Sequence, residues 1–581
     1  MLTLRTAVLA VLVAVLASLA PAVAPARADG LQDGDTFPCA WWTDGATRAY
    51  SLKQDGTQLA TLYHQVTIVD GKRVLTTKAE AGTGDTVQRT GTVVVYDPAG
   101  KVLHYELRTP QFVATIDFDS DKLTVHNPGG GEKVIPRGRL PLVDSNNIMA
   151  LEVVLAATNT AKWTVGKTRK TRVRFAASLA EAEYSITIAA VADGVTSLTD
   201  SLGEKISWKP DSGITSVTVG ATEFARLDGV EFPDWPIGPT KTFAYKLPAN
   251  ATFSATEVQV PRPQYHTEQS GAGGFALGGT LNIPDKATHG EGPYPAVYFQ
   301  SGSGLQDRHG FAPGANVDCG TWEVLDAVAN AGFVVLRVDD RGCGKSPFGG
   351  KEFDPLSITV HNLLGDARAC VDYLKGLPEV DDERIFVIGH SEGATIAPML
   401  ANRPDSQLRG IVAMAGMGRN LMDVIADQVR WSMEAAGQTP EEIAAGMARQ
   451  RELMDAVCAG RKPDPELVDA GTWKEFQPVA TWMASHYRQD VRRIYREVKV
   501  PVLVVQGAAD IQVLPDKDAR PYARCLAEGA CRDCTLRIFD DLDHMFKPCG
   551  GRPSNLKMYE EDRRVDPTFI KVLVDWLVAH R

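Results

Sequence analysis

Residues 384 to 400 read RIFVIGHSEGATIAPML, a short and mostly apolar run, a glycine-bounded pentapeptide and a stretch of small and apolar residues. The order predicts a buried strand, a sharp turn and a helix. Gly389 to Gly393 match the pattern Gly-x-Ser-x-Gly, which requires that setting. A serine at the tip of such a turn has a strained backbone and an exposed hydroxyl, and side chains at Gly389 and Gly393 would clash with neighbouring chain. Ser391 is therefore the candidate nucleophile.

The composition indicates a folded protein of more than one domain. The chain has 581 residues, of which 44% are hydrophobic and 23% charged, and this length predicts two to four domains. The formal net charge is -11, and no long basic run occurs. A protein that binds nucleic-acid phosphates needs clustered positive charge, so we expect no nucleic-acid partner.

Residues 1–28 have the features of a cleaved signal peptide. Arg5 supplies a positive charge, Ala7 to Ala20 is apolar apart from one serine, and Ala26-Arg27-Ala28 fits the cleavage rule before Asp29. The apolar core is shorter than the roughly 20 residues of a membrane-spanning helix. The sequence therefore predicts export to the periplasm or the extracellular space, with no membrane span after signal cleavage.

Nine cysteines follow the predicted cleavage site. In an oxidising compartment we expect structural disulfides, and the odd count leaves at least one thiol free or paired with another chain. Cys525, Cys531, Cys534 and Cys549 lie close together in the sequence and allow three connectivities. Cys531-x-x-Cys534 also fits a metal knuckle or a redox motif, although no second CxxC accompanies it.

The first predicted domain, residues 29–255, is rich in β-strands. Short alternating stretches end in turn signals such as Asp70-Gly71 and Asp193-Gly194, which favours an antiparallel sheet or barrel. Residues 140–157 are a candidate helix. The segment is too short for the multi-bladed propeller that precedes the catalytic domain of some serine peptidases.

From residue 256 the pattern changes to apolar strands that alternate with amphipathic helices. This alternation predicts an α/β domain with a mostly parallel sheet covered by helices on both faces. We assign residues 256–415 and 499–581 to its two parts. The intervening residues, 416–498, are largely helical and far exceed an ordinary connection, so they are predicted to form an inserted cap.

The cap is rich in tryptophan and methionine, which suits either an apolar substrate pocket or the cap's own core. The residues concerned are Trp431, Met433, Met447, Met454, Trp473, Trp482 and Met483.

A serine nucleophile needs a histidine base, and that histidine needs a carboxylate to orient it. Asp510 ends a tight turn after the apolar run 502–505, and His544 follows the later strand 536–539. Both positions are predicted to lie at the carboxyl ends of parallel strands, so we assign Asp510 as the acid and His544 as the base. The competing carboxylates, which we interpret as helix-start or surface residues, are Asp516, Asp518, Asp541 and Asp543.

Acyl transfer also requires donors that stabilise an oxyanion, commonly two backbone N–H groups. One is predicted at Glu392, directly after the nucleophile. The other is predicted at Ser303, because the run 294–300 ends in Ser-Gly-Ser-Gly and the flanking Gly302 and Gly304 allow close approach of the backbone.

These motifs together resemble those of bacterial α/β-hydrolases related to dienelactone hydrolases and serine aminopeptidases. Within this group, the chain is most similar to exported esterases that carry a β-rich domain ahead of the catalytic one. The resemblance covers residues 260–581 except the cap, and it implies an α/β-hydrolase fold. The matching segments are 301–304, 307–308, 339–346, 389–393, 507–510 and 543–544.

Two positions depart from these relatives. Ser301 stands where they usually have a histidine that braces the oxyanion loop, and Ala394 stands where they often have a second glycine. The side chain of Glu392 also needs a partner if it is buried. We expect Arg308 or Arg341 to supply one, because their loops converge on the same strand ends; the alternative is a solvated carboxylate.

The leading hypothesis is a serine esterase that cleaves a small-molecule carboxylic ester through an acyl-enzyme. A serine peptidase of aminopeptidase or acylaminoacyl type uses the same triad and is the first alternative. A non-catalytic binding protein on a hydrolase fold is the second. We expect no metal or cofactor, and the sequence does not predict an oligomeric state.

Overall fold

The computed structural model describes residues 39, 41–54, 56–82, 87–109, 113–126, 132–136, 142–143, 148–157, 164–175, 181–209, 211–238, 244–266, 268–312, 317–350, 353–468 and 470–581. The predicted signal peptide, residues 1–28, lies outside this range. Contacts divide the chain near residue 240 into an N-terminal and a C-terminal unit.

The N-terminal unit is built on a single large sheet. Its strands pair in the order β8-β7-β6-β5-β4-β3-β2-β1-β15-β14-β13-β12-β11-β10-β9, so almost every strand pairs with its neighbour in sequence. The pairs are antiparallel except β9 with β10. The bounds are β1 Thr47–Gln54, β2 Thr57–Val69, β3 Lys72–Ala81, β4 Gln88–Tyr96, β5 Val102–Arg108, β6 Val113–Phe118, β7 Lys122–His126, β8 Glu132–Pro136, β9 Leu142–Val143, β10 Thr168–Phe175, β11 Glu181–Ala192, β12 Val195–Asp200, β13 Lys205–Lys209, β14 Gly213–Val219 and β15 Thr222–Leu227. The prediction of a β-rich region is confirmed.

Two predicted turns show why the hairpins form where they do. Asp70 and Gly71 have φ angles of 49° and 74°, and Asp193 and Gly194 have φ angles of 50° and 75°. Positive φ at both central residues is the geometry that Asp-Gly favours in two-residue hairpins. The turn residues therefore set the register of the strands on either side.

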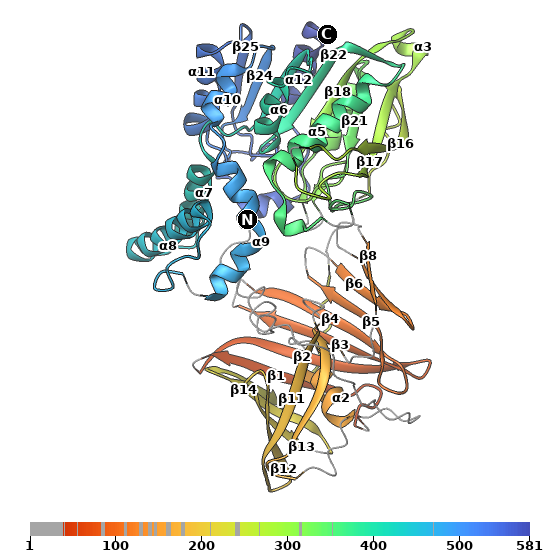
Figure 1. The fold of residues 1–581 in the computed structure, drawn as a ribbon, viewed down its shortest axis with the longest axis vertical. Helices are drawn as coiled ribbons and strands as arrows, with labels where there is room; N and C mark the ends of the chain where they lie inside the picture. Colours follow the sequence, from red (N-terminus) through yellow and green to blue (C-terminus); the bar gives the residue numbers. More distant parts are fainter. Residues whose placement is uncertain are drawn as a thin grey trace. The chain divides into compact units, whose positions relative to one another are not determined.

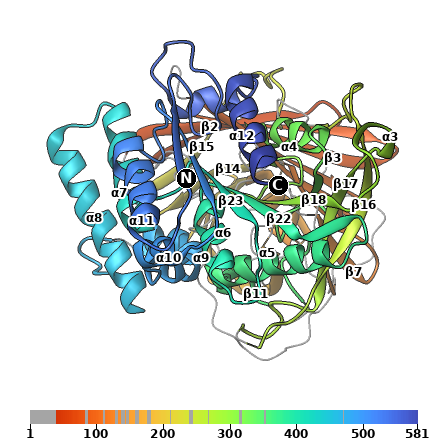
Figure 2. The same cartoon turned by 90° about the horizontal axis from the view of Figure 1, so that it is seen from above.

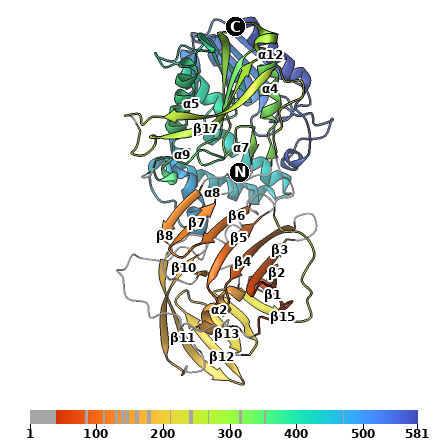
Figure 3. The same cartoon turned by 90° about the vertical axis from the view of Figure 1, so that its right-hand side faces the viewer.

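Helix α2 (Ile148–Ala157) lies among the strands of this unit (Figure 3). It is apolar around most of its circumference, which is the pattern of a fully buried helix. Met149 and Val153 belong to one buried cluster, whereas Leu151 and Leu155 belong to another. The helix thus joins two cores, and the predicted helix over 140–157 is present in its second half.

The one acid in α2 is buried and anchors the unit. Glu152 accepts hydrogen bonds from the indole N–H groups of Trp41 and Trp42 at 2.8 and 2.9 Å. It also accepts from the guanidinium of Arg48 at 2.5 Å and from the backbone N–H of Ile214 at 2.9 Å. Its side chain has no solvent exposure, so these donors replace water entirely.

The C-terminal unit contains an eight-stranded sheet in the order β16-β17-β21-β18-β22-β23-β24-β25. The strands from β21 to β25 are parallel, and β16 and β17 extend the sheet as an antiparallel edge. The bounds are β16 Phe253–Arg262, β17 Phe275–Pro284, β18 Tyr294–Gln300, β21 Val334–Val338, β22 Val380–His390, β23 Gly410–Met414, β24 Val502–Gly507 and β25 Cys534–Phe539; β19 Phe311–Ala312 and β20 Val317–Asp318 form a separate small ribbon. Strands and helices alternate along this region, which is the coarse α/β character that was predicted.

Alternate residues of the strands enter two separate apolar clusters. Val387 packs in one cluster with residues of α5 and α6, and Ile388 packs in the other with residues of α4 and α12. Helices are seen on both sides of the strands in Figures 1 and 2. The helices are α3 Lys286–His289, α4 Thr321–Asn330, α5 Val360–Lys375, α6 Gly393–Ala401, α7 Leu421–Ala435, α8 Pro440–Ala459, α9 Ala470–Tyr487, α10 Val491–Glu497, α11 Arg520–Glu528 and α12 Pro567–His580, with short helical turns η5 Pro355–Ser357, η6 Pro515–Ala519 and η7 Leu556–Glu560.

Helices α7 to α10 lie between β23 and β24. The ends of α8 show how the sequence sets their bounds: Thr439 and Glu442 form a capping box, Pro440 is the first helical residue, and Gly460 ends the helix at φ 65°. Helices α7, α8 and α9 contact one another (Figure 1). Their shared core contains Met454 and Met483, and the rings of Trp473 and Trp482 pack against it.

Among the described residues, no helix has the length and apolar character needed to cross a bilayer.

We expect Glu152→Ala to destabilise the N-terminal unit by about 3–5 kcal/mol, because it leaves the buried charge of Arg48 and several donors without their partner. Urea unfolding followed by tryptophan fluorescence measures this. Glu80→Ala is the matched control, since the Glu80–Arg89 pair is solvent-exposed and should contribute less than about 1 kcal/mol. Equal losses in the two variants would contradict the assigned role of Glu152.

Candidate active site

Ser391 lies at a sharp turn between β22 and α6, as predicted. Its φ angle is 55°, in the left-handed region that non-glycine residues rarely adopt. The backbone N–H of Ser391 donates to the carbonyl of Met414 at 2.8 Å, and its own carbonyl accepts from Ala394 N–H at 3.1 Å. The strained residue is therefore held in place by hydrogen bonds from both sides.

The two motif glycines are required by contact with backbone. A Cβ atom on Gly389 would lie 2.2 Å from the carbonyl oxygen of Gly393. A Cβ atom on Gly393 would lie 2.2 Å from the carbonyl oxygen of Gln300, at the end of β18. Both distances are far inside van der Waals contact, and backbone cannot move aside as a flexible side chain can. The prediction that side chains at these positions would clash is confirmed.

Asp510 and His544 come together at the carboxyl ends of β24 and β25. The Nδ1 atom of His544 donates to Oδ2 of Asp510 at 2.7 Å, and both residues are buried. The second oxygen of Asp510 accepts from the backbone N–H groups of Gln512 and Val513 at 2.8 and 3.0 Å. Because Nδ1 carries the proton, Nε2 of His544 is left to accept one.

The electrostatics of this pair favour a basic imidazole. Burial by itself lowers the pKa of His544, but the charge of Asp510 and its hydrogen bond act in the opposite direction, with a further contribution from Asp543. The net pKa of His544 lies above its ordinary value of 6.5. Asp510 therefore both orients the ring and stabilises its protonated form.

The four competing carboxylates have other partners. Asp518 binds Arg419, and Asp543 binds Arg563. Asp541 accepts from the backbone N–H groups of Gly550 and Gly551, and the exposed Asp516 pairs with Arg520. Asp510 is thus the carboxylate that contacts His544, in agreement with the assignment from chain order.

His390 joins the serine turn to the histidine loop. Its Nε2 donates to the backbone carbonyl of His544 at 2.9 Å, and the two rings lie 4.8 Å apart between centroids. Burial, with a smaller effect of the His544 charge, lowers the pKa of His390 to about 3, so this ring is neutral at physiological pH. His390 is therefore a neutral hydrogen-bonding neighbour of His544.

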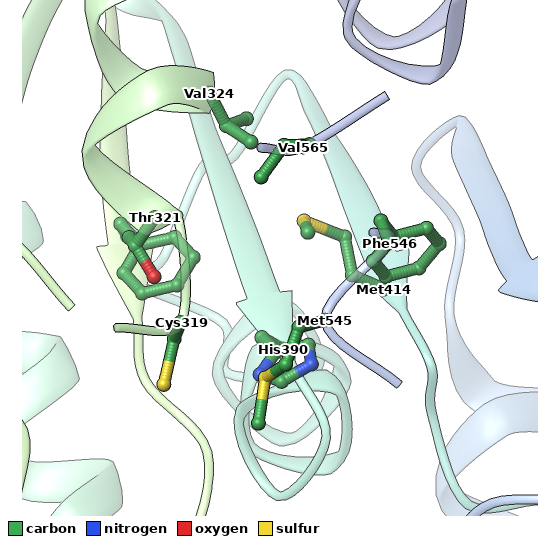
Figure 4. Close-up of a pocket in the computed structure, with 9 residues that line it drawn as sticks. Cys319, Thr321, Val324, His390, Met414, Met545, Phe546 and Val565 are labelled. Atoms are coloured by element: carbon green, nitrogen blue, oxygen red, sulfur yellow. The ribbon is translucent and has the colours of Figure 1, made fainter. Parts of the chain in front are cut away.

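A small cavity lies behind His390 (Figure 4). It has a volume of about 10 Å³, comparable with that of a single water molecule. It is lined by Phe299, Cys319, Thr321, Val324, His390, Met414, Met545, Phe546 and Val565. This space is too small for a substrate, and its lining packs the back of the serine turn and the histidine loop.

The loop after β18 lies against the serine turn. A Cβ atom on Gly302 would lie 3.1 Å from the Cβ atom of Ser391 and 3.3 Å from Nδ1 of His390. Ser303 and Gly304 follow and are exposed, and Gly304 has a φ angle of 98°. The position of this loop suits the predicted donor at Ser303, whose role stays a prediction, as does that of the Glu392 N–H.

Asp340 braces this loop, a contact that was not predicted. The hydroxyl of Ser301 lies 2.5 Å from Oδ1 of Asp340, and the backbone N–H of Gln306 donates to Oδ2 at 2.9 Å. Asp340 therefore holds the loop after β18 at two points, the Ser301 side chain and the Gln306 main chain. The signal in the sequence was the acidic pair 339–340 directly after β21.

Asp340 holds a proton at neutral pH. Burial raises its pKa, against the hydrogen bonds from Ser301 and Gln306, and the charges of Glu392 and Asp339 add to the rise. The resulting pKa is about 8.

The predicted pairing of Glu392 with Arg308 or Arg341 is wrong, and so is the alternative of a solvated carboxylate. Glu392 is 5% exposed. Its Oε1 accepts from the indole N–H of Trp482 at 2.7 Å and from Nε2 of His486 at 2.5 Å. Both donors belong to α9, which the sequence assigned to the cap.

The two arginines instead pair with acids that belong to other segments of the chain. Arg308 binds Asp339 through Nε and a terminal nitrogen at 3.0 and 2.6 Å. Arg341 binds Asp366 of α5 through Nε at 2.7 Å and through a terminal nitrogen at 2.5 Å. These bidentate pairs are nearly buried, so neither guanidinium is available to Glu392.

All nine cysteines are free in the structure, so the predicted disulfides are not formed. The C-terminal group shows the reason. The thiol of Cys531 donates to the carbonyls of Val500 and Asp533, whereas that of Cys534 lies 3.8 Å from the carbonyl of Ala523. Closeness in sequence did not orient these side chains toward one another. Over the described residues, no group of three or more His, Cys, Asp or Glu could hold a metal ion.

A family model described as "Serine aminopeptidase, S33" matches residues 311–547. The chain is 26% identical to esterase EstD of Thermotoga maritima over 304 residues, which is 52% of this chain. The match spans 65% of the length of EstD.

Similar solved structures include esterase Pf2001 of Pyrococcus furiosus and Est1E of Butyrivibrio proteoclasticus. Pf2001 is 15% identical, and the alignment covers 59% of this chain and 99% of that one, with a TM-score of 0.34. Est1E is 16% identical, and the alignment covers 56% and 98%, with a TM-score of 0.30.

We expect Asp510→Asn to lower the pKa of His544 to below 6.5, because burial then acts without the opposing carboxylate charge. NMR titration of the histidine ring signals, assigned by a His544→Gln variant, measures this. Asp516→Asn is the control and should leave the titration unchanged. A His544 pKa that is equal in wild type and Asp510→Asn would contradict the coupling.

We expect Asp340→Asn to stabilise the protein increasingly as pH rises from 5 to 8. The folded wild type keeps the Asp340 proton up to a pKa of about 8, whereas the unfolded chain releases it near 3.8. Rising pH therefore destabilises the wild type, by up to about 1.4 kcal/mol per pH unit, whereas asparagine does not titrate. Urea unfolding at several pH values measures the difference, and a difference that is independent of pH would contradict it.

Proposed function

We propose that this protein is a serine hydrolase that cleaves carboxylic esters through an acyl-enzyme. The observation that carries the proposal is the strained Ser391 at the β22–α6 turn, with a buried Asp510–His544 pair tied to the same turn through His390. A strained serine whose turn is hydrogen-bonded to the loop of an oriented imidazole is typical of an activated nucleophile. The similarity to EstD supports an ester as the substrate.

The proposed reaction has two stages. Ser391 Oγ attacks the ester carbonyl while Nε2 of His544 takes the hydroxyl proton, and the N–H groups of Glu392 and Ser303 stabilise the oxyanion. The C–O bond then breaks, and the alcohol leaves with the proton from His544. In the second stage His544 takes a proton from water, the resulting hydroxide attacks the acyl-enzyme, and the acid is released as Ser391 regains its proton.

A serine peptidase is the second candidate, because the matching family model carries an aminopeptidase description. Esters and amides share the acyl-enzyme route, so the triad does not separate them. A third candidate, an inert binding protein, conflicts with a complete set of catalytic residue types. We further propose that the protein acts after export, on the basis of the signal-like pattern in residues 1–28.

We expect the wild type to hydrolyse nitrophenyl esters, and Ser391→Ala to reduce the rate by at least about 10⁴-fold. A series of acyl chains from acetyl to palmitoyl, run beside aminoacyl anilides, reports both the substrate class and the preferred chain length. Labelling by a fluorophosphonate probe should be lost in Ser391→Ala. Turnover of anilides alone would favour the peptidase, and no turnover or labelling at all would favour the binding protein.

A further inference from the structure

One face of helix α9 is polar and is directed at the sheet domain. Trp482, Ser485 and His486 lie three and four positions apart, so they share one side of the helix. The adjacent Met483 and Ala484 belong to the cap's core. The helix therefore packs its apolar side within the cap and presents hydrogen-bonding groups on the other.

The principal contact of this polar face is the residue that follows the nucleophile. Trp482 and His486 both donate to Oε1 of Glu392, and their rings meet edge to face at 5.0 Å between centroids. Glu392 and His486 are 5% and 3% exposed. Hydrogen bonds to a buried carboxylate are charge-assisted and stronger than those between neutral groups.

A second contact anchors the same face. The hydroxyl of Ser485 accepts from the backbone N–H of Val360, the first residue of α5, at 2.9 Å, and donates to the carbonyl of Trp482 at 2.7 Å. Helix α9 also packs on η5 and α5. The cap helix is thus held at two separate points, of which only one involves the serine turn.

The carboxylate of Glu392 takes its hydrogen-bond donors from α9. Arg308 is bound to Asp339, and Arg341 is bound to Asp366. The nearby Asp340 is itself an acid, so it offers Glu392 no positive charge. If α9 withdraws, the Glu392 carboxylate loses both of its donors. A buried carboxylate without partners is strongly destabilised, so it would have to move toward water. The carboxylate and the backbone N–H belong to the same residue. A shift of the carboxylate toward water therefore disturbs the position of the Glu392 N–H.

We propose that Trp482, His486 and the Glu392 carboxylate form a latch that positions the oxyanion donor. The latch holds Glu392 at the start of α6, where its backbone has φ −55° and ψ −41°, so that its N–H is aimed at the reacting carbonyl oxygen. The position of the cap helix α9 therefore controls the orientation of the oxyanion donor, and with it the activity of the site. The inference rests on the proposed function, since it assigns the Glu392 N–H to the transition state. The three side chains act as positioning residues rather than as catalytic ones.

The test compares a variant that removes one donor of the latch with a variant that removes the charge of its acceptor. Trp482→Phe and Glu392→Gln should each lower kcat on a nitrophenyl ester by about tenfold, less than the 10²–10³-fold of a fully lost oxyanion donor, with KM changed by less than about twofold. Because both act through one contact, the double variant should lose no more than Glu392→Gln alone. The rate of fluorophosphonate labelling should fall in parallel.

Two variants of the same helix serve as controls. Trp473→Phe removes an indole N–H that has no hydrogen-bond partner within the described residues, and it should leave kcat unchanged. Ser485→Ala loosens the second anchor without touching Glu392, so it should change kcat less than Trp482→Phe does. If circular dichroism shows that Glu392→Gln does not fold, His486→Gln is compared with His486→Leu. Glutamine keeps an N–H donor and leucine does not, so His486→Gln should have the higher kcat.

Three outcomes would overturn the latch while the proposed function stands. In each, the wild type is active. In the first, the latch variants keep kcat within about twofold of the wild type; in the second, the losses of kcat add in the double variant. In the third, Trp473→Phe lowers kcat as much as Trp482→Phe does. A wild type that neither turns over esters or anilides nor reacts with the fluorophosphonate overturns the proposed function itself, and the latch with it. The two failures are therefore distinguishable.

Discussion

The left-handed backbone of Ser391 is the constraint on which the rest of the site depends. This backbone conformation is held by the surrounding chain. On either side of Ser391 the main chain is packed so closely that a Cβ atom on Gly389 would overlap Gly393, and one on Gly393 would overlap Gln300. The end of β18 and the start of α6 are fixed by this contact. His390 extends the same constraint to the loop of His544. The turn that carries Ser391 is therefore in contact with both the loop of His544 and the loop that follows β18.

Buried charge around this turn is neutralised locally, and this determines how the cap is attached. Arg308 and Arg341 are paired with Asp339 and Asp366, and Asp340 is protonated. The carboxylate of Glu392 has α9 as its source of donors. The cap is therefore bound to the catalytic region by a polar contact at the residue beside the nucleophile, in addition to its packing on α5.

Chain order predicted which loops carry Asp510 and His544, and the structure brings these two side chains together. Asp510 and His544 were located because parallel strands place their carboxyl ends at one edge of a sheet, whatever their side chains do. The predictions about partners were less successful. Glu392 was assigned to the wrong donors, and the disulfides are not formed. Both errors have the same origin: which charged group or thiol meets which is decided by side-chain direction at close range, and many choices are compatible with one order of strands.

The sequence by itself determined the strand–turn–helix that presents Ser391, the order of the strands that bring Asp510 and His544 to it, and the helical character of residues 416–498. These features depend on local periodicity, glycine and topology, which are properties of short segments. Only the tertiary structure decided that Asp340 braces the oxyanion loop and that Trp482 and His486 bind Glu392. Those contacts join residues 39 and about 90 positions apart, and hydrogen bonds at such separations exist only once the intervening chain has packed.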